Sequence, residues 1–198
     1  FHEYAHAWTA YKLGDDTAKS QGRLSLNPLK HMDPIGIVML LFLGFGWGRP
    51  VEIDSRNFNR NISVRKAEAV VSIAGPLANF ILAIVFSAIY GALIKFNALT
   101  SMDTRTALTI ITILQSIISI NIGLGVFNLI PLPPLDGSKV LSYFLPYNAR
   151  NWFENNQQIF YIIFLIIWIT GIAGTIISPA ITSIYYGLMK LVSLVFGL

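Results

Sequence analysis

Long stretches without charged side chains constrain this chain more than any other feature of its sequence. Three of them cover residues 69–94, 107–130 and 159–177, and a last apolar stretch over 180–198 holds only Lys190. A helix needs about 20 apolar residues to cross a hydrocarbon core of ~30 Å, and each of the first three runs is close to or above that length. Only 12% of all residues are charged, whereas about 25% is typical of soluble domains. The sequence therefore predicts a protein that crosses a membrane three times, with 180–198 as a candidate fourth span or, as the alternative, a surface helix.

The expected fold is an all-α polytopic membrane protein, a helical bundle that forms one domain over 1–198 in a lipid bilayer. The apolar run 35–47 is too short to span the bilayer as a helix, so it predicts an interfacial or re-entrant segment. Just before it, polar and apolar side chains alternate over 23–26, which predicts a short strand. A Ser-Pro pair at 178–179 predicts the end of the third span.

The first helix, expected over 2–14, carries the pattern His-Glu-x-x-His. Its histidines, His2 and His6, share one face of a helix and lie about 6 Å apart along the axis. Two imidazoles in this arrangement can bind one zinc ion, and Glu3 can act on water held by that ion. A polar patch at a helix end is the alternative. Because the chain opens inside this helix, we expect a further piece of the protein to precede Phe1.

A hydrolytic zinc site needs a third protein ligand and an open position for water. The chain has no cysteine, so the candidates are His31, Asp33 and Asp136. Asp136 is favoured because it follows the second span closely, where a carboxylate is costly unless it is paired or coordinates a metal. Three prolines just before it prevent a regular helix, so the backbone there must lie against protein or water. The alternatives are an acid in a cytoplasmic turn for Asp136 and a loop histidine for His31.

The distribution of basic residues predicts which way the spans run. Nine Lys and Arg residues lie in 11–66, whereas 95–105 and 137–158 hold two each. Cytoplasmic loops carry an excess of basic residues, which places 11–66 in the cytoplasm of a multi-pass protein of the plasma (cell inner) membrane. Two spans separate this loop from Asp136, so both parts of the candidate site face the cytoplasm. The same bias accounts for the net charge of +4, and we expect no nucleic-acid partner.

Four stretches of the sequence together resemble a known family. They are Phe1-His-Glu-Tyr-Ala-His6, Arg23-Leu-Ser-Leu-Asn-Pro-Leu-Lys-His-Met-Asp-Pro34, Ala74-Gly-Pro-Leu-Ala-Asn79 and Asn128-Leu-Ile-Pro-Leu-Pro-Pro-Leu-Asp-Gly137. In this order they are similar to the site-2 protease family of intramembrane zinc metallopeptidases. The chain looks most like the compact microbial branch of that family, without a PDZ domain. The family has a further span before its zinc helix.

The resemblance implies an enzyme that uses one zinc ion per chain to cut transmembrane segments of membrane proteins. Carried over to this sequence, His2, His6 and Asp136 bind the zinc, and Glu3 activates water as the general base. Four further residues are expected to be structural residues near the site, namely Gly75, Pro76, Pro131 and Gly137.

Two amides, Asn79 and Asn128, lie within the spans and close to the proline breaks. Either could hold an extended substrate strand or donate a hydrogen bond to the oxyanion. Hydrogen bonding between helices is an equally good explanation of both.

Other functions fit the sequence less well. A serine intramembrane protease needs a histidine within its spans, and an aspartyl type needs a second aspartate beside Asp136. A zinc carrier or sensor could use the same ligands, but it would not need Glu3 and would carry more polar residues along its spans. An inactive homologue that binds membrane segments without cutting them is the remaining alternative.

Overall fold

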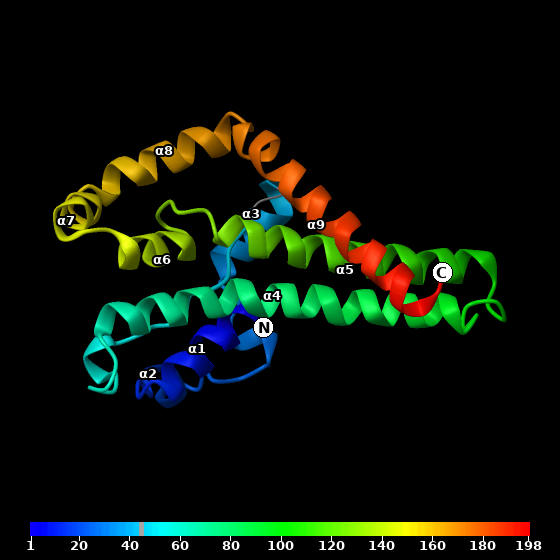
Figure 1. Ribbon diagram of the computed structural model, residues 1–198, viewed down its shortest axis with the longest axis horizontal. Coiled ribbons are helices and arrows are strands. Elements are labelled where there is room, and N and C mark those ends of the chain that lie inside the picture. The colour runs from blue at the N-terminus through cyan, green and yellow to red at the C-terminus, as the bar shows by residue number, and fades with distance from the viewer. Residues whose placement is uncertain (44–45) are drawn as a thin grey trace.

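The computed structural model of the chain describes residues 1–43 and 46–198, and the regular secondary structure of these residues is helical (Figure 1). The elements, in chain order, are α1 (His2–Lys12), α2 (Thr17–Ser20), the short 3-10 helix η1 (Pro28–Lys30), α3 (Pro34–Leu43), the 3-10 helix η2 (Ser55–Asn57), α4 (Val64–Lys95), α5 (Thr104–Asn128), α6 (Asp136–Phe144), α7 (Tyr147–Asn155), α8 (Gln157–Ile169) and α9 (Ile172–Phe196).

Three helices, α4, α5 and α9, are long and apolar enough to cross a membrane, counted over the described residues. Figure 1 shows α4 and α5 running antiparallel and α9 crossing beside them, and all three pack on one another. Their shared core contains Ala83 of α4 with Ile118 and Ile122 of α5, against which side chains of α9 such as Leu188 pack. The all-α membrane fold predicted from the sequence is confirmed.

The first expected span, 69–94, lies inside α4, whereas the second, 107–130, extends two residues beyond the end of α5 at Asn128. Both helices begin a few residues before the expected spans. α4 begins after Ser63, whose Oγ accepts a hydrogen bond from Lys66 N, and α5 begins after Asp103, whose Oδ1 accepts one from Thr106 N. Side-chain caps of this kind satisfy amides that have no partner within the helix. The helices therefore begin in polar residues outside the apolar runs.

The third expected span, 159–177, is not one helix. α8 and α9 are separated by Thr170 and Gly171, and Gly171 has a φ of 74°. This left-handed conformation is open to glycine and strained for residues with a side chain, so Gly171 ends one helix and starts the next. The break expected at Pro179 is wrong, because this proline lies inside α9, where it removes a single backbone donor. The candidate fourth span, 180–198, is thus the end of a longer helix.

The short strand expected over 23–26 is also wrong, because these residues form no strand pairing. Arg23 is 5% exposed and its Nη2 donates to the carbonyl oxygen of Arg49 at 2.6 Å. The carbonyl oxygen of Ser25 accepts a hydrogen bond from His31 Nε2 at 2.7 Å. Hydrogen bonds from side chains to the backbone therefore hold this segment in an irregular conformation. A four-residue alternation of polar and apolar side chains is too short to impose a strand against these bonds.

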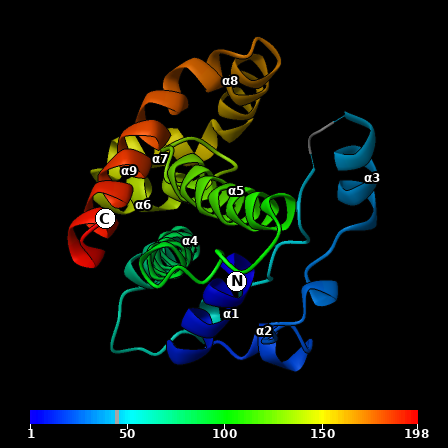
Figure 2. The ribbon, with the colours of Figure 1, turned by 90° about the vertical axis from the view of Figure 1, so that its right-hand side faces the viewer.

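The apolar run 35–47 forms α3 in its first part, whereas residues 44–45 lie outside the described residues. At ten residues, α3 is too short to cross a bilayer. Figure 2 shows it set apart from α4 and α5, and Ile35, Leu41 and Phe42 are exposed. The expectation of an interfacial or re-entrant segment here remains a prediction.

Helices α1 and α6 both pack against α4. The contact of α1 is an apolar cluster in which Ala10 meets Ala67 and Val71 of α4. Figure 1 shows α2, α6 and α7 toward the N-terminal end of α4, while the loop 96–103 and residue 198 lie at the opposite end. The two segments that carry the predicted metal ligands are therefore brought together on one helix.

Candidate metal centre

Helix α1 places its two histidines against each other. The ring centroids of His2 and His6 are 4.6 Å apart, with the rings almost perpendicular. Their Nε2 atoms are separated by 3.0 Å. The spacing of four residues thus does what helix geometry predicts, because both ring nitrogens converge on one point beside the helix.

Asp136, the first residue of α6, meets this pair from a distant part of the sequence. Its Oδ2 lies 3.1 Å from His2 Nε2 and 3.3 Å from His6 Nε2. Within the described residues, these three side chains form a group whose candidate ligand atoms all lie within 4.8 Å of one another. Two motifs that are far apart in the sequence therefore meet in one cluster.

A backbone contact fixes which nitrogen of His6 faces the cluster. His6 Nδ1 lies 2.7 Å from the carbonyl oxygen of Val71, in the turn of α4 before Pro76. A carbonyl only accepts, so Nδ1 carries the proton and Nε2 of the neutral ring presents a lone pair. A hydrogen bond from the other ring nitrogen to a carbonyl is the usual support of a metal-binding histidine.

The three atoms fit a metal ion. Asp136 Oδ2 is buried and has no hydrogen-bond partner among the described residues, although it lies within 3.3 Å of both Nε2 atoms. A buried carboxylate oxygen is costly without a partner. Ligands at about 2.0–2.1 Å from a tetrahedral zinc lie about 3.3 Å from one another, close to the 3.0, 3.1 and 3.3 Å observed. Nitrogen and carboxylate ligands without sulfur also suit zinc.

Gly75 lets α4 approach the cluster. A Cβ at this position would meet His6 Nε2 and would lie 2.6 Å from His2 Cε1 and Nε2. Pro76 follows directly and is fully buried. Gly75, predicted to be structural, therefore lies at the wall of the cluster, whereas a structural role of Pro76 stays a prediction.

The residues between α5 and α6 form turns rather than helix, as the prolines predict. Gly137 packs against this segment, because a Cβ there would lie 2.5 Å from the carbonyl oxygen of Ile130. Ser138 Oγ donates to the carbonyl oxygen of Leu135 at 2.6 Å. These contacts accompany a turn in which Asp136 points at α1, whereas the structural role expected for Pro131 stays a prediction.

Glu3 lies beside the cluster but belongs to a different set of contacts. Its Oε2 accepts a hydrogen bond from Val51 N at 2.9 Å. The partner segment follows α3 and has no regular secondary structure. This contact joins a helix to an irregular segment, and no pattern in the sequence predicts it.

The two predicted amides differ in their surroundings. Asn79 is 1% exposed and its Nδ2 has no hydrogen-bond partner among the described residues. It lies four residues after Gly75, on the same face of α4. Asn128 ends α5, and its Nδ2 donates to the carbonyl oxygen of Leu124 at 3.0 Å. Asn79 therefore offers a free donor, whereas the donor of Asn128 is engaged within its own helix.

The two alternative third ligands lie in other contacts. His31 Nε2 bonds to the carbonyl oxygen of Ser25, and Asp33 Oδ1 accepts a hydrogen bond from Gly36 N at 2.8 Å. Neither side chain belongs to the group of candidate ligands found in the described residues.

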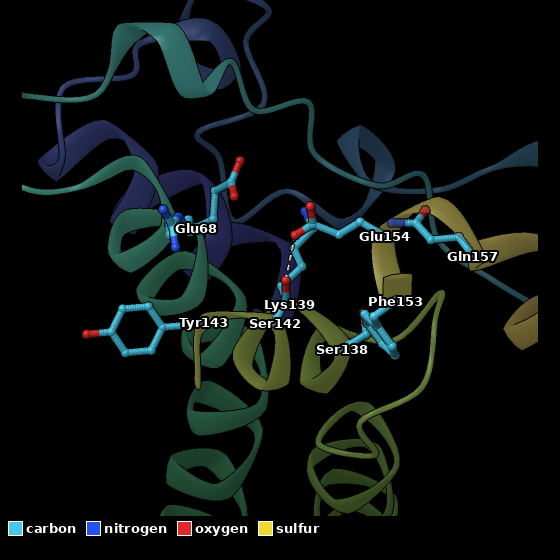
Figure 3. A pocket seen from close by; sticks show the side chains of 9 residues that line it. Glu68, Ser138, Lys139, Ser142, Tyr143, Phe153, Glu154 and Gln157 are labelled. Carbon is cyan, nitrogen blue, oxygen red and sulfur yellow. Dashed lines mark hydrogen bonds between the residues drawn. The ribbon is translucent and has the colours of Figure 1, made fainter. Parts of the chain in front are cut away.

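A polar cavity of about 370 Å³ between α4, α6 and α7 was missed by the sequence reasoning (Figure 3). Glu68, Ser138 and Lys139 are among the residues that line it. Ser142 Oγ donates to Glu154 Oε1 at 2.7 Å across its wall. The change from apolar to charged residues on either side of the spans predicts where the helices end. It does not predict how the ends of different helices pack together, so it could not locate the cavity.

The fold and the side-chain cluster define a class, the polytopic helical membrane proteins with a candidate metal centre. Within that class, residues 1–171 match peptidase family M50, the family of the site-2 proteases. The chain belongs to this family, which confirms the resemblance found in the sequence and supports a peptidase.

Relatives in bacteria carry names of the same kind. The chain is 38% identical over 201 residues to "Putative zinc metalloprotease YwhC" of Bacillus subtilis, an alignment that covers 98% of this chain and 87% of the relative. It is 28% identical to "Putative zinc metalloprotease Rip2" of Mycolicibacterium smegmatis, over 85% of this chain and 62% of the relative. The protein of the same name in Mycobacterium tuberculosis is 26% identical, over 95% of this chain and 66% of the relative. The chain thus spans less than two thirds of the mycobacterial relatives' length. No solved structure matches it.

Proposed function

We propose that this protein is a zinc-dependent endopeptidase that cuts transmembrane segments of membrane proteins. In this proposal one zinc ion per chain is held by His2, His6 and Asp136, and Glu3 is the general base. The observation that carries it is the cluster itself, in which ligand atoms from two segments far apart in the sequence lie within 3.3 Å of one another. The names of the relatives favour zinc as the metal.

The chemistry divides between the metal and the side chains. Zinc, when bound, lowers the pKa of a coordinated water to about 7 and polarises a carbonyl group. Glu3 takes a proton from water at its carboxylate and delivers it to the leaving amine. Val71 holds the tautomer of His6 through the carbonyl contact at 2.7 Å, which keeps Nε2 free to bind the metal.

A transmembrane segment is the substrate because the cluster lies against α4, one of the helices long enough to span the bilayer. A helical substrate keeps its carbonyls in internal hydrogen bonds, so it must unwind locally before a carbonyl can react. The unpartnered Nδ2 of Asn79 is a suitable donor to an unwound strand or to the oxyanion. Asn128 would first have to release the carbonyl of Leu124.

The proposed site faces the cytoplasm at the inner membrane. Helix α2 of the basic loop, together with α6 and α7 of the segment 137–158, lies toward the N-terminal end of α4 (Figure 1). The larger excess of basic residues marks the cytoplasmic side. Water then reaches the cluster from the aqueous phase nearest to α6. The polar cavity beside Ser138 lies on that side.

Substitution of Glu3 tests the catalytic part of the proposal. Glu3→Gln keeps the size and one acceptor oxygen of the side chain but removes the base. We expect it to retain zinc and to lose cleavage of a single-span reporter protein by at least 10²-fold, in line with general base catalysis. Glu154→Gln, an exposed change of the same type, serves as the control and keeps activity. Retained cleavage by Glu3→Gln would refute the mechanism.

A zinc carrier or sensor is the second candidate, because the ligand set alone does not require catalysis. Such a protein would bind zinc and show no difference between wild type and Glu3→Gln in any metal-dependent property. An inactive homologue would bind membrane segments without producing fragments. Fragment analysis of the reporter protein by mass spectrometry separates both from a peptidase.

A further inference from the structure

Among the described residues, the carboxylate of Glu3 is held by the main chain and forms no ion pair with a charged side chain. Val51 N donates to Glu3 Oε2 at 2.9 Å, across 48 positions of the sequence. Such a bond restricts the side chain to one orientation and leaves the second carboxylate oxygen available. The position of the Glu3 carboxylate therefore depends on where the backbone of Val51 lies.

The segment that carries this donor depends on Arg23. Residues 49–54 form no helix or strand, so no ladder of backbone bonds fixes them. Arg23 is 5% exposed, and its Nη2 donates to the carbonyl oxygens of Arg49 and Pro50, at 2.6 and 3.4 Å. A buried guanidinium that bonds to carbonyl groups costs free energy when those partners are removed. It therefore holds the two residues immediately before Val51.

The ends of the segment are fixed as well. Arg49 N donates to the carbonyl oxygen of His31 at 2.8 Å. At the other end, Asp54 N donates to Asp15 Oδ2 at 2.8 Å. Between these anchors, the contact with Arg23 and the contact with Glu3 are adjacent, so a shift at one is transmitted to the other through one or two peptide units.

We propose that Arg23 and residues 49–51 position the Glu3 carboxylate for proton transfer, with Arg23 acting through the backbone of Arg49 and Pro50 and the amide of Val51. The proposal rests on the proposed function, in which Glu3 is the general base. Arg23 touches neither the metal cluster nor the reacting atoms, so it is a positioning residue. A displacement of about 1 Å in such a group is enough to lower a rate by roughly 10²-fold.

The contact itself is tested without any substrate. Hydrogen exchange at the Val51 amide is measured in detergent micelles by mass spectrometry with fragmentation, for wild type, Glu3→Ala and Glu3→Gln. Glu3→Ala removes the acceptor, so exchange at Val51 becomes at least tenfold faster. Glu3→Gln keeps a carbonyl oxygen as acceptor and preserves slow exchange. Unchanged exchange in Glu3→Ala overturns the proposal.

The same measurement tests the role of Arg23. Arg23→Ala speeds exchange at Val51 while amides in α5 stay protected, and Arg23→Lys, which keeps a donor, gives a smaller increase. An increase that extends equally to α5 shows general destabilisation and counts against a positioning role. Unchanged exchange at Val51 in Arg23→Ala also contradicts the proposal.

A matched pair at Val51 tests the effect on catalysis. Val51→Pro removes the amide donor, whereas Val51→Ala retains it. With the single-span reporter protein as the probe, Val51→Pro lowers kcat about 10–100-fold relative to Val51→Ala, with zinc retained and KM within about twofold. Wild-type kcat in Val51→Pro overturns the positioning role. If Val51→Pro does not fold, the hydrogen-exchange rate of the Val51 amide in Glu3→Ala decides whether the proposal stands.

The outcome for Glu3→Gln separates this proposal from the proposed function. If Glu3→Gln cleaves the reporter like wild type, the general base assignment fails, whatever the exchange data show. If Glu3→Gln is inactive and holds zinc while Val51→Pro is fully active, the proposed function stands and only the positioning role fails.

Discussion

Gly75 contributes to the candidate metal centre by having no side chain. It lies on α4 where His2 and His6 approach closest, and a Cβ there would meet His6 Nε2 and lie 2.6 Å from His2 Nε2. The same two nitrogens form the cluster with Asp136 Oδ2. At the scale of single residues, therefore, the site depends on the lack of a side chain at Gly75 as well as on the three polar side chains.

Gly75→Ala is expected to weaken zinc binding roughly 10–100-fold, the usual effect of disturbing residues that support metal ligands. The methyl group would push both imidazoles away from Asp136, although alanine by itself favours a helix by about 1 kcal/mol over glycine. Gly187→Ala in α9 is the matched control, because a Cβ there meets no atom within 4 Å. Isothermal titration of the zinc-depleted protein measures both. Zinc affinity equal to wild type in Gly75→Ala contradicts the packing argument.

At the scale of elements, a buried carboxylate joins α1 and α2 to the segment before α4. Asp15 is fully buried and accepts hydrogen bonds from Thr17 N, Asp54 N and Asn57 Nδ2. Burial alone would raise the pKa of this carboxyl group, but the hydrogen bonds, led by that of the Thr17 hydroxyl, outweigh it and lower the pKa below the ordinary value of 3.8. The carboxylate thus holds one end of the segment that reaches Glu3.

Asp15→Asn is expected to lower the free energy of unfolding by roughly 1–3 kcal/mol at pH 7, because buried donors lose a charged acceptor. A group with a lowered pKa in the folded state stabilises above its unfolded pKa, and this stability is lost as pH falls through the folded pKa. The difference between wild type and variant should therefore shrink below about pH 4. Tryptophan fluorescence during thermal unfolding in detergent measures it, with the exposed Asp16→Asn as control. A difference in unfolding free energy between wild type and Asp15→Asn that stays constant down to pH 2.5 would contradict the role given to the ionised Asp15 carboxylate.

The accuracy of the sequence reasoning varied among the elements for physical reasons. The helices of the first two spans and of the His-Glu-x-x-His motif follow from long periodic or apolar runs, which dominate local structure. The break between α8 and α9 was misplaced because proline was weighted over glycine. Pro179 fits within a helix, whereas Gly171 adopts a φ of 74° that ends one.

The site was predictable in part for a similar reason. Spacing along a helix and three prolines before Asp136 point to a shared location, and the structure brings these ligand atoms within 3.3 Å. The contact of Glu3 with Val51 and that of Arg23 with Arg49 and Pro50 could not be predicted. Both join a side chain to the backbone of an irregular segment, and such contacts leave no periodic pattern in the sequence.

At the scale of the whole molecule, the three long helices set the sides on which the loops emerge. α9 runs in the same general direction as α4 (Figure 1), and Gly197 lies near Lys95 Nζ at the far end of the bundle. The loop 96–103 and residue 198 should thus face one side of the membrane. The cluster and the segment 137–158 should face the other.

Cysteine labelling tests this orientation cleanly, since the chain has no cysteine of its own. In intact cells a membrane-impermeant maleimide should label Ser101→Cys and Leu198→Cys. Ala149→Cys should react only after the cells are lysed, because the basic loops are held in the cytoplasm. Labelling of Ala149→Cys and Ser101→Cys from the same side contradicts the proposed topology.

The central claim is that two segments far apart in the sequence share one zinc ion. Zinc per purified chain, measured by inductively coupled plasma mass spectrometry for wild type, Asp136→Ala and His31→Ala, tests it most directly. The account predicts about one zinc in wild type and in His31→Ala, and a loss of zinc in Asp136→Ala, because three protein ligands are needed to hold the ion. Zinc bound as tightly by Asp136→Ala as by wild type would contradict the shared site and leave the two histidines as an isolated pair on α1.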